Sequence, residues 1–202
     1  MPRPLEIAAA FVLLVITLPL TLVSLIISSL FIAFPPFYFS RRVGRFGVEY
    51  THWKIRSMKK GRETGRVFFE TDRINFWGKL LRRLHLDELP ELLLILTGRM
   101  SFVGPRPLPA LLQRGLDTSV RETVRPGWTG LAQLRLLRRG TLDKNLQIRL
   151  DTRYVNRRSA VYDLKILLAT FRGVFESRAL NLDPAGTAER ISYAHKLTDG
   201  DK

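Results

Sequence analysis

The sequence is organised around LHLDELPELLLILTGRMSFVGPRP, residues 84–107, where an acidic pair precedes an apolar run and a proline-bracketed arginine follows it. We predict a helix over Asp87–Leu96, because aspartate is a favoured N-cap residue. Pro90 then falls in the first helical turn, where a proline is tolerated. Gly98 suits the end of this helix, since glycine readily adopts the backbone conformation of a C-terminal stop.

The acidic pair Asp87-Glu88 admits two interpretations. Two acids at a helix start are commonly a cap that meets the positive end of the helix dipole. The basic neighbourhood favours a phosphate site instead, because helix N-termini and guanidinium groups both bind phosphate. The basic neighbours are Arg82, Arg83, His85, Arg99 and Arg106, the last of these in a rigid turn predicted over Gly104–Pro109.

Carboxylates beside a phosphate site indicate phosphoryl-transfer chemistry. Mg²⁺ is usually held by one or two carboxylates together with substrate phosphates, so Asp87 and Glu88 are candidate metal ligands. Aspartate can also act as a nucleophile through an acyl-phosphate, which makes Asp87 the candidate nucleophile. Arg106 would then bind the phosphate and stabilise its developing charge. The sequence contains no Walker loop, nucleophile elbow, zinc-protease motif or dinucleotide fingerprint that would compete with this interpretation.

The N-terminal region predicts a retained membrane helix. No charged residue occurs from Ile7 to Phe39, and the apolar run Ile7–Ala33 is long enough to cross a bilayer. A cleaved signal peptide would have a shorter apolar region, more basic residues before it and a small-residue cleavage site after it. Pro19 predicts a kink near the middle. The kinked helix either spans the membrane, which composition alone favours, or re-enters on the same face.

The charge balance indicates anionic partners. The chain has 33 Lys and Arg against 18 Asp and Glu, a formal net charge of +15, and no cysteine. Such a field attracts nucleic acid, anionic lipid head groups or nucleotide phosphates. The lack of cysteine excludes disulfides and thiolate zinc sites. Basic residues cluster just after the apolar run, which predicts a cytoplasmic domain that lies on anionic phospholipid. They are Arg41, Arg42, Arg45, Lys54, Arg56, Lys59 and Lys60.

The remaining segments predict a helix-rich domain with little sheet. Residues 36–58 alternate aromatic or β-branched with basic residues around two glycines, as in a short β-hairpin or an irregular strand pair. Helices are predicted over Asn75–Arg83, Leu142–Asn156 and Asp163–Phe175, a surface loop over 61–72, weak helix over 110–124, a turn over 125–130, and an exposed tail after Ser177. The apolar face of the last helix either packs on the core, the favoured role, or lies on the membrane. It comprises Leu164, Leu167, Leu168, Phe171, Val174 and Phe175.

Ordered blocks over Leu5–Val174 resemble the bacterial sugar transferase family, small monotopic polyprenyl-phosphate phosphoglycosyl transferases. The blocks are LEI at residues 5–7, RVG at 42–44, KIRSM at 54–58, LDELPEL at 86–92, MSFVGPRP at 100–107, RPGWTG at 125–130, Leu150-Asp151 with Tyr154, and DLKI at 163–166. A match of several blocks in one order is specific. The sequence departs from the family pattern at Leu18, Arg99 and 131–137, and the last of these leaves the identity of the donor open.

The resemblance implies transfer of a sugar-1-phosphate from a UDP-sugar to polyprenyl phosphate with Mg²⁺. Asp87 would be the nucleophile of a phosphosugar-aspartyl intermediate, and Glu88 would hold the metal or handle the proton of the acceptor. Arg106 would bind phosphate, with Arg82 and Asp163 as supporting substrate-binding candidates. The family's kinked segment is re-entrant, which reverses the preference from composition. The implied location is the cytoplasmic face of the bacterial inner membrane.

The combined prediction is an α-rich, membrane-associated α+β protein with a kinked re-entrant helix, interfacial amphipathic helices and a short β-hairpin. Its parts are a membrane helix over 1–34, a cytoplasmic transferase domain over 35–177 and a tail over 178–202. The expected partners are the UDP-sugar, polyprenyl phosphate and anionic phospholipid, but no nucleic acid; homo-oligomerisation stays open. The alternatives are a membrane-anchored module that binds nucleic acid or anionic lipid, and a membrane phosphatase that uses Asp87.

Overall fold

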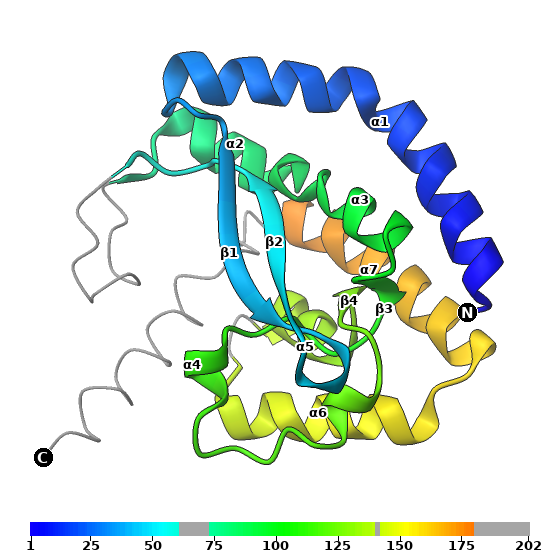
Figure 1. The fold of residues 1–202 in the computed structure, drawn as a ribbon. Helices are drawn as coiled ribbons and strands as arrows, with labels where there is room; N and C mark the ends of the chain where they lie inside the picture. Colours follow the sequence, from blue (N-terminus) through cyan, green and yellow to red (C-terminus); the bar gives the residue numbers. More distant parts are fainter. Residues whose placement is uncertain (61–72, 140–141, 180–202) are drawn as a thin grey trace, which may run out of the picture.

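The computed structural model describes residues 1–60, 73–139 and 142–179 of the chain. The loop predicted over 61–72 and most of the tail predicted over 178–202 fall outside these residues. Within them, a long N-terminal helix arches over a helix-rich body that carries one β-hairpin and one small parallel strand pair (Figure 1). The helix-rich composition with a short antiparallel strand pair confirms that part of the sequence-based prediction.

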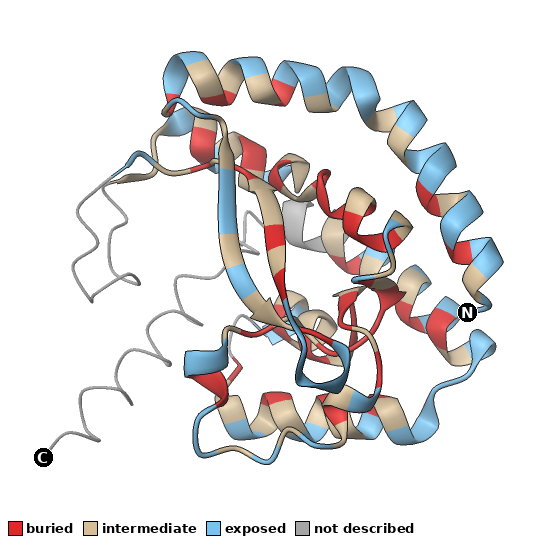
Figure 2. Cartoon of the chain, viewed as in Figure 1, coloured by how far each residue is buried: buried red, intermediate tan, exposed pale blue. Residues whose placement is uncertain are grey.

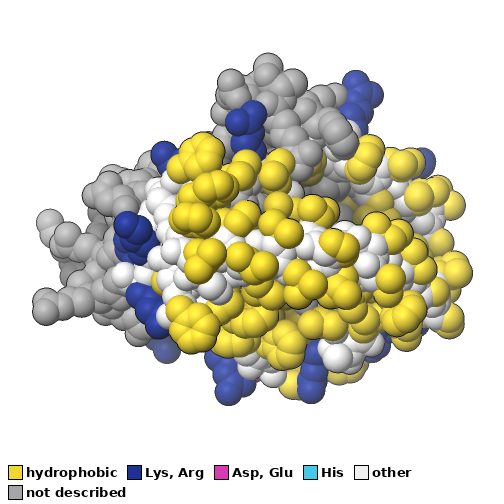
Figure 3. All heavy atoms as spheres, turned by 90° about the horizontal axis from the view of Figure 1, so that it is seen from above, with side chains coloured by type: hydrophobic (Ala, Val, Ile, Leu, Met, Phe, Trp, Pro, Cys, Tyr) yellow, Lys and Arg dark blue, Asp and Glu magenta, His cyan; other side chains and the backbone are white. Residues whose placement is uncertain are grey.

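Helix α1 covers Arg3–Phe31 and contains Pro19. It bends along its length and follows the body below it (Figure 1), as expected where a proline removes one backbone hydrogen bond. By length and composition it is apolar enough to cross a membrane. Most of its large apolar side chains face outward, and from above they form an apolar surface with Lys and Arg at its margins (Figure 3).

Both ends of α1 are bonded to the same body. Near the N-terminus, Arg3 donates to the carbonyl oxygen of Ile95, and Ser101 donates to the carboxylate of Glu6. Near the C-terminus, Ser28 Oγ donates to the carbonyl oxygen of Arg56 at 2.7 Å. Glu6, Ser24 and Ser28 are buried, whereas most of the large apolar side chains between them are exposed. These polar residues of α1 therefore face the protein, and most of its large apolar side chains face away from it.

Strands β1 (Phe37–Val43) and β2 (Glu49–Ile55) form the predicted antiparallel hairpin. Pairing of Ser40 with His52 and of Tyr38 with Lys54 sets the register. Because side chains alternate between the two faces of a strand, His52 and Lys54 lie on one face of β2. That face packs against the segment that carries the acidic pair, since β2 contacts both the 3₁₀ turn η3 (Leu86–Glu88) and helix α3 (Glu91–Leu96).

Helix α2 covers Phe76–Arg83, as predicted, and the side chain of its N-cap Asn75 accepts from the N–H of Gly78 at 2.9 Å. The helix predicted over Asp87–Leu96 is wrong at its start, because Asp87 lies in η3 and α3 begins only at Glu91. The physical reason is Pro90, which has no N–H to donate to a preceding carbonyl oxygen. The helical hydrogen bonds are therefore interrupted there, and Pro90 becomes the N-cap of α3.

The end of α3 is as predicted. Gly98 adopts a φ of +81°, and the N–H groups of Arg99 and Met100 both reach back to the carbonyl oxygen of Leu94, at 2.9 and 3.0 Å. This is the pattern of a Schellman stop, in which a left-handed residue lets following N–H groups bond the last helical carbonyls. The stop turns the chain directly into strand β3 (Ser101–Val103).

The turn predicted over 125–130 is wrong, because Gly127–Thr129 forms strand β4 and pairs in parallel with β3. Close approach of the two backbones explains the turn-like composition. A Cβ at Gly127 would lie 2.0 Å from the backbone nitrogen of Gly104, so the glycine is needed for contact rather than for a turn. Between the two strands, the region predicted as weakly helical holds α4 (Ala110–Gln113) and η4 (Arg121–Thr123).

The C-terminal half consists of α5 (Leu131–Arg139), which was not predicted, α6 (Lys144–Arg157) and α7 (Ala160–Ala179). On α7, Ile166 is buried, but the side chains of Leu164, Leu168 and Phe171 are 55–67% exposed. The favoured prediction that the apolar face of this helix packs on the core is therefore wrong for these three residues. Buried positions follow the inner sides of the elements throughout (Figure 2).

The main core lies where α3, β3, α6, α7 and the first half of α1 meet. It contains Leu92, Ile95 and Met100, each with no exposed surface. Ala10 of α1 is equally buried in the same cluster. A segment chosen by its composition as a membrane helix therefore also completes the core, and the rigid segment Leu92–Met100 gives the preceding acidic pair a fixed support.

Candidate active site

The acidic pair lies on the short turn η3, between α2 and α3. His85 precedes it with a φ of +55°, a left-handed conformation that histidine adopts more readily than most side chains. The N–H of Glu88 donates back to the carbonyl oxygen of His85 at 3.3 Å. Asp87 is 8% exposed. The turn therefore places one carboxylate almost fully inside the protein without a regular helix start.

The second carboxylate is held by a lysine from the hairpin. Nζ of Lys54 is ion-paired with Oε1 of Glu88 and lies 3.2 Å from Oε1 of Glu91. Nε2 of His52 lies 3.3 Å from the same Glu91 oxygen. His52 and Glu91 are both 3% exposed. The inner face of β2 thus supplies a polar cluster beneath the acidic pair, and Lys54 connects Glu88 with Glu91.

The two carboxyl groups differ in their affinity for protons. Burial, followed by the charge of Glu88, raises the pKa of Asp87 above its usual range, against the opposing charges of Lys54 and Arg82. Burial would also raise the pKa of Glu88, but Lys54 outweighs it and that pKa falls. Glu88 is therefore the stronger acid and stays ionised, while Asp87 is the more basic and more nucleophilic carboxylate once it has lost its proton.

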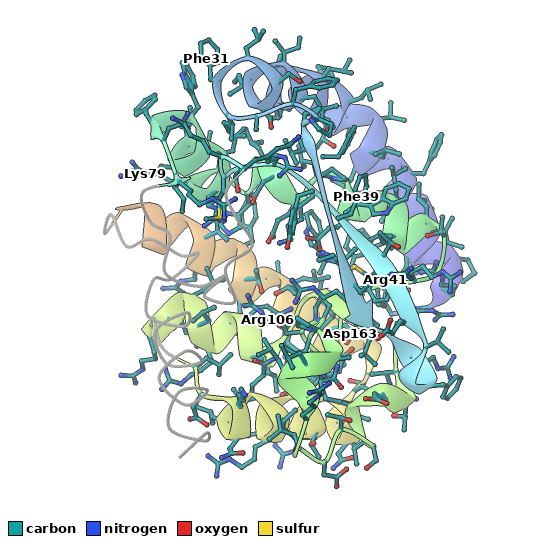
Figure 4. The ribbon with its side chains drawn as sticks, turned by 60° about the vertical axis from the view of Figure 1, so that its left-hand side comes forward. Phe31, Phe39, Arg41, Lys79, Arg106 and Asp163 are labelled. Carbon is teal, nitrogen blue, oxygen red and sulfur yellow. The ribbon has the colours of Figure 1, made fainter. Side chains whose placement is uncertain are left out.

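Two arginines predicted as substrate-binding residues lie at the acidic pair. Arg82, on α2, donates from Nε to Oγ of Ser57 at 2.9 Å and acts electrostatically on Asp87. Arg106, after β3, acts on Glu88 and lies between the hairpin and the C-terminal helices (Figure 4). The structure thus brings together Asp87, Glu88, Arg82 and Arg106, which are separated by up to 24 positions, 82 to 106, in the chain.

Asp163 is not brought to this group. It lies on α7, where its carboxylate pairs with the amino group of Met1 and accepts a hydrogen bond from the hydroxyl of Tyr154 at 2.8 Å. It lines a separate polar cavity of about 270 Å³ together with Arg3, Glu6 and Arg125. These contacts of Asp163 therefore connect the N-terminus beside α1 with the body rather than with the acidic pair.

The site also contains three residues that the sequence analysis did not predict as site residues, namely Lys54, Glu91 and Arg42. Burial lowers the pKa of Arg42, and the positive charge of Arg106 lowers it further. The two guanidinium groups therefore repel each other electrostatically. The available signal was the alternation of the hairpin, which puts Lys54 and His52 on one face. Nothing in the sequence indicates which partner that face meets, since Lys54 and Glu88 are 34 positions apart.

The donor set fits Mg²⁺ bound with the help of substrate phosphates. No group of three or more His, Asp or Glu side chains able to hold a metal occurs among residues 1–60, 73–139 and 142–179. Mg²⁺ commonly uses one or two carboxylates and takes its other ligands from phosphate and water, and Asp87 with Glu88 meets that requirement. Glu88 stays ionised beside Lys54, whereas the raised pKa of Asp87 favours its protonated form, so Glu88 is the carboxylate that keeps its charge.

Comparison with known proteins identifies the family to which the sequence is similar. The sequence matches the bacterial sugar transferase family over residues 1–177. It is 35% identical over 196 residues to "Uncharacterized sugar transferase EpsL" of Bacillus subtilis, covering 94% of this chain and 95% of that protein. It is 35% identical over 179 residues to the UDP-glucose:undecaprenyl-phosphate glucose-1-phosphate transferase of Caulobacter vibrioides, covering 83% of this chain and 67% of that protein.

A further relative is longer than this chain. The UDP-N-acetylgalactosamine-undecaprenyl-phosphate N-acetylgalactosaminephosphotransferase of Aeromonas hydrophila is 30% identical over 181 residues, and the match covers 85% of this chain but only 43% of that protein. The family match, in contrast, includes both α1 and the body with the acidic pair. On these matches, the chain belongs to the bacterial sugar transferase family.

Proposed function

We propose that the protein transfers a sugar-1-phosphate from a UDP-sugar to polyprenyl phosphate at the cytoplasmic surface of the bacterial inner membrane. The observation that carries the proposal is the buried Asp87, whose pKa is raised. It lies beside Glu88, which is ion-paired with Lys54, and near two arginines from separate elements. A strongly perturbed carboxylate among phosphate-binding groups is typical of an active site. The relatives named as undecaprenyl-phosphate transferases support the reaction class.

The transfer proceeds in two displacements at one phosphorus atom. A carboxylate oxygen of Asp87 attacks the β-phosphorus of the donor, the bond from that phosphorus to the bridging oxygen breaks, and UMP leaves with the electron pair. A phosphate oxygen of the polyprenyl phosphate then attacks the same phosphorus, and the Asp87 carboxylate is released. The raised pKa supports Asp87 as the nucleophile, because basicity and nucleophilicity of a carboxylate rise together.

The remaining groups have supporting roles. Glu88 is a poor proton acceptor because its pKa is lowered, so its charge is better suited to cation binding than to general base catalysis. Asp87 and Glu88 would hold Mg²⁺, which would supply positive charge to the diphosphate. Arg82, which acts on Asp87, and Arg106, which acts on Glu88, hold phosphate oxygens of the donor and stabilise the charge that develops on them.

The membrane arrangement follows from the ends of α1. A helix that enters and leaves the bilayer on one side keeps both ends near one body, and Arg3 and Ser28 are both bonded to it. We therefore infer that α1 is re-entrant, with the acidic pair at the cytoplasmic surface where a lipid-linked phosphate can reach it. The exposed apolar residues of α7 provide a further surface for contact with the interface.

The assay for this proposal combines purified protein, Mg²⁺, polyprenyl phosphate and a panel of UDP-sugars labelled in the β-phosphate. We expect lipid-linked label with one donor and its loss in Asp87→Asn. Asp117→Asn is the matched control, because Asp117 is exposed and, among the described residues, bonds only to Ser119 of its own loop. Release of free phosphosugar without lipid would favour a phosphatase, and full activity of Asp87→Asn would remove the nucleophile assignment.

The topology is tested separately by labelling. The protein has no cysteine, so single cysteines at Pro2 and at the C-terminus report position without interference. Labelling of both from the cytoplasmic side is expected for a re-entrant helix. Labelling from opposite sides of the membrane would show that α1 spans it.

A further inference from the structure

The backbone of Arg106 is held on both sides by one buried ion pair. Its carbonyl oxygen accepts a hydrogen bond from Nη2 of Arg121, and its N–H donates to the carboxylate of Asp151. Arg121 and Asp151 also bond each other, from Nε to Oδ2 at 3.1 Å. The two residues are 5% and 1% exposed. The three residues therefore form a closed polar triangle inside the protein.

The arginine loop, Pro105–Pro107, has few backbone groups that can form hydrogen bonds with the rest of the protein. Pro105 and Pro107 lack an N–H, so Arg106 carries the only backbone donor of this segment. On one side, the carbonyl oxygen of Pro105 accepts from the N–H of Gly127 on β4 at 2.9 Å. On the other side, the Arg121–Asp151 pair supplies the contact. Two residues further on, the carbonyl oxygen of Leu108 accepts from the N–H of Val43 on β1 at 3.0 Å, and the Arg121–Asp151 pair holds the Arg106 backbone between these two contacts.

Helix α6 joins this contact to the rest of the site. Tyr154 follows Asp151 by three positions, which places both side chains on one helix face. The hydroxyl of Tyr154 donates to the carbonyl oxygen of Val103 at 3.0 Å. One face of α6 therefore holds both the end of β3 and the loop that follows it. The position of Arg106 depends on α6 although no residue of α6 is among the groups assigned to the reaction.

We expect the pair to fix the geometry of the loop rather than to add to the stability of the fold. Removing two charges from water is costly, and a buried ion pair often adds no more stability than apolar residues of similar volume. What such a pair provides is direction, because each of its hydrogen bonds fixes the partner in one place. Here the fixed partner is the backbone that carries a guanidinium acting on Glu88.

We propose that Arg121 and Asp151 are positioning residues that hold the Arg106 guanidinium at the acidic pair, where it binds the diphosphate of the donor. This inference rests on the proposed transferase function. Neither residue touches substrate in it, since both act through the Arg106 backbone. A displacement of a positioned group by about 1 Å can cost on the order of 100-fold in rate, so loss of the pair should be visible in the kinetics.

The test is a double-mutant cycle on kcat/KM for the donor. Asp151→Ala should lower kcat/KM by about 10- to 100-fold. Combined with Arg106→Ala, it should cause no further loss, because a residue that acts only through Arg106 has nothing left to position. Asp151→Asn should recover part of the loss, since its amide oxygen still accepts from the Arg106 N–H, and it serves as the test variant if Asp151→Ala does not fold.

The matched control is Asp143→Ala, at the start of the same helix. Asp143 caps α6 by accepting from the N–H of Leu146 at 2.9 Å and has no part in the triangle. Any loss it causes should multiply with that of Arg106→Ala. The positioning role is overturned if the Asp151 and Arg106 losses also multiply in a protein that transfers sugar phosphate. Absence of lipid-linked product from the unaltered protein would instead contradict the proposed function.

Discussion

At the scale of single residues, Lys54 gives the two adjacent carboxyl groups different properties. It pairs with Glu88 and lowers the pKa of that side chain, whereas burial dominates at Asp87 and raises its pKa. Two neighbouring acids in the same environment would compete for one proton. In the proposed mechanism, the lysine would keep one carboxylate charged for the cation while the other gains basicity for attack on phosphorus.

Lys54→Met tests this role directly. Without the cation, the pKa values of both Glu88 and Asp87 rise, so the acidic pair takes up protons at higher pH. We expect the acidic limb of the pH profile of kcat/KM to move to higher pH and activity at neutral pH to fall by about 10-fold or more. Lys79→Met removes the same charge from an exposed position on α2 and should leave the acidic limb unchanged.

Asp87→Asn should make the folded protein more stable at neutral pH. The pKa of Asp87 is raised on folding, so ionisation above that pKa costs stability, and protonation as the pH falls through it removes the cost. Asparagine lacks the charge at every pH. We expect a Tm about 2–4 °C higher than that of the unaltered protein at neutral pH, measured by thermal unfolding. The gain should disappear at acidic pH; a gain independent of pH would contradict the linkage.

At the scale of elements, the sequence predicted what short-range patterns determine. The helix predicted over Asn75–Arg83, the Gly98 stop and the hairpin all depend on neighbouring residues, and all three are present. The errors occur where distant segments meet. Strand β4 exists because β3 lies beside it, and three residues of alternating burial carry too little pattern to distinguish a strand from a turn.

The same division applies to the site. Asp87, Glu88, Arg82 and Arg106 share a basic neighbourhood in the sequence and could be singled out together. The contact of Lys54 with Glu88 spans 34 positions, and that of Arg121 with Asp151 spans 30. Side-chain pairs of this kind depend on how the elements pack, and residue types alone do not specify them. Asp163 was singled out by its motif, yet its carboxylate contacts the amino group of Met1 and the hydroxyl of Tyr154 on α6.

Gly127→Ala tests the strand pair that supports the arginine loop. The added Cβ would lie 2.0 Å from the backbone nitrogen of Gly104, so β3 and β4 must separate. We expect a loss of about 2 kcal/mol or more in the free energy of unfolding, together with reduced donor affinity. Gly173→Ala is the control, since its nearest neighbours lie at 3.9 Å and alanine favours a helix interior. Equal stability of the two variants would contradict the close-approach argument.

At the scale of the whole molecule, the body and α1 form one structure rather than a domain with a separable anchor. Ala10 of α1 belongs to the main core, and Glu6 is buried against Ser101. The bend of α1, which contains Pro19, lets both halves of the helix follow the body (Figure 1). Removal of α1 would therefore expose core residues as well as detach the protein from the membrane.

Pro19→Ala tests the bend. Alanine restores the missing N–H and favours a straight helix, which cannot return to the body as easily. We expect part of the variant to place its N-terminus on the opposite side of the membrane, measured by labelling of a cysteine at position 2. Leu18→Ala is the control, because it removes apolar surface next to the bend but changes no backbone bond. An unaltered labelling pattern in Pro19→Ala would show that the contacts of Arg3 and Ser28 suffice.

The attachment of both ends of α1 to one body also determines how the protein should respond to bilayer thickness. A spanning helix must match its apolar length to the hydrocarbon layer, and mismatch makes it tilt or deforms the lipid. A helix tied at Arg3 and at Ser28 to the same body has its depth set by that body instead. The acidic pair would then stay at a constant height above the lipid phosphates as acyl chains lengthen. Transfer measured in vesicles of increasing chain length should vary little.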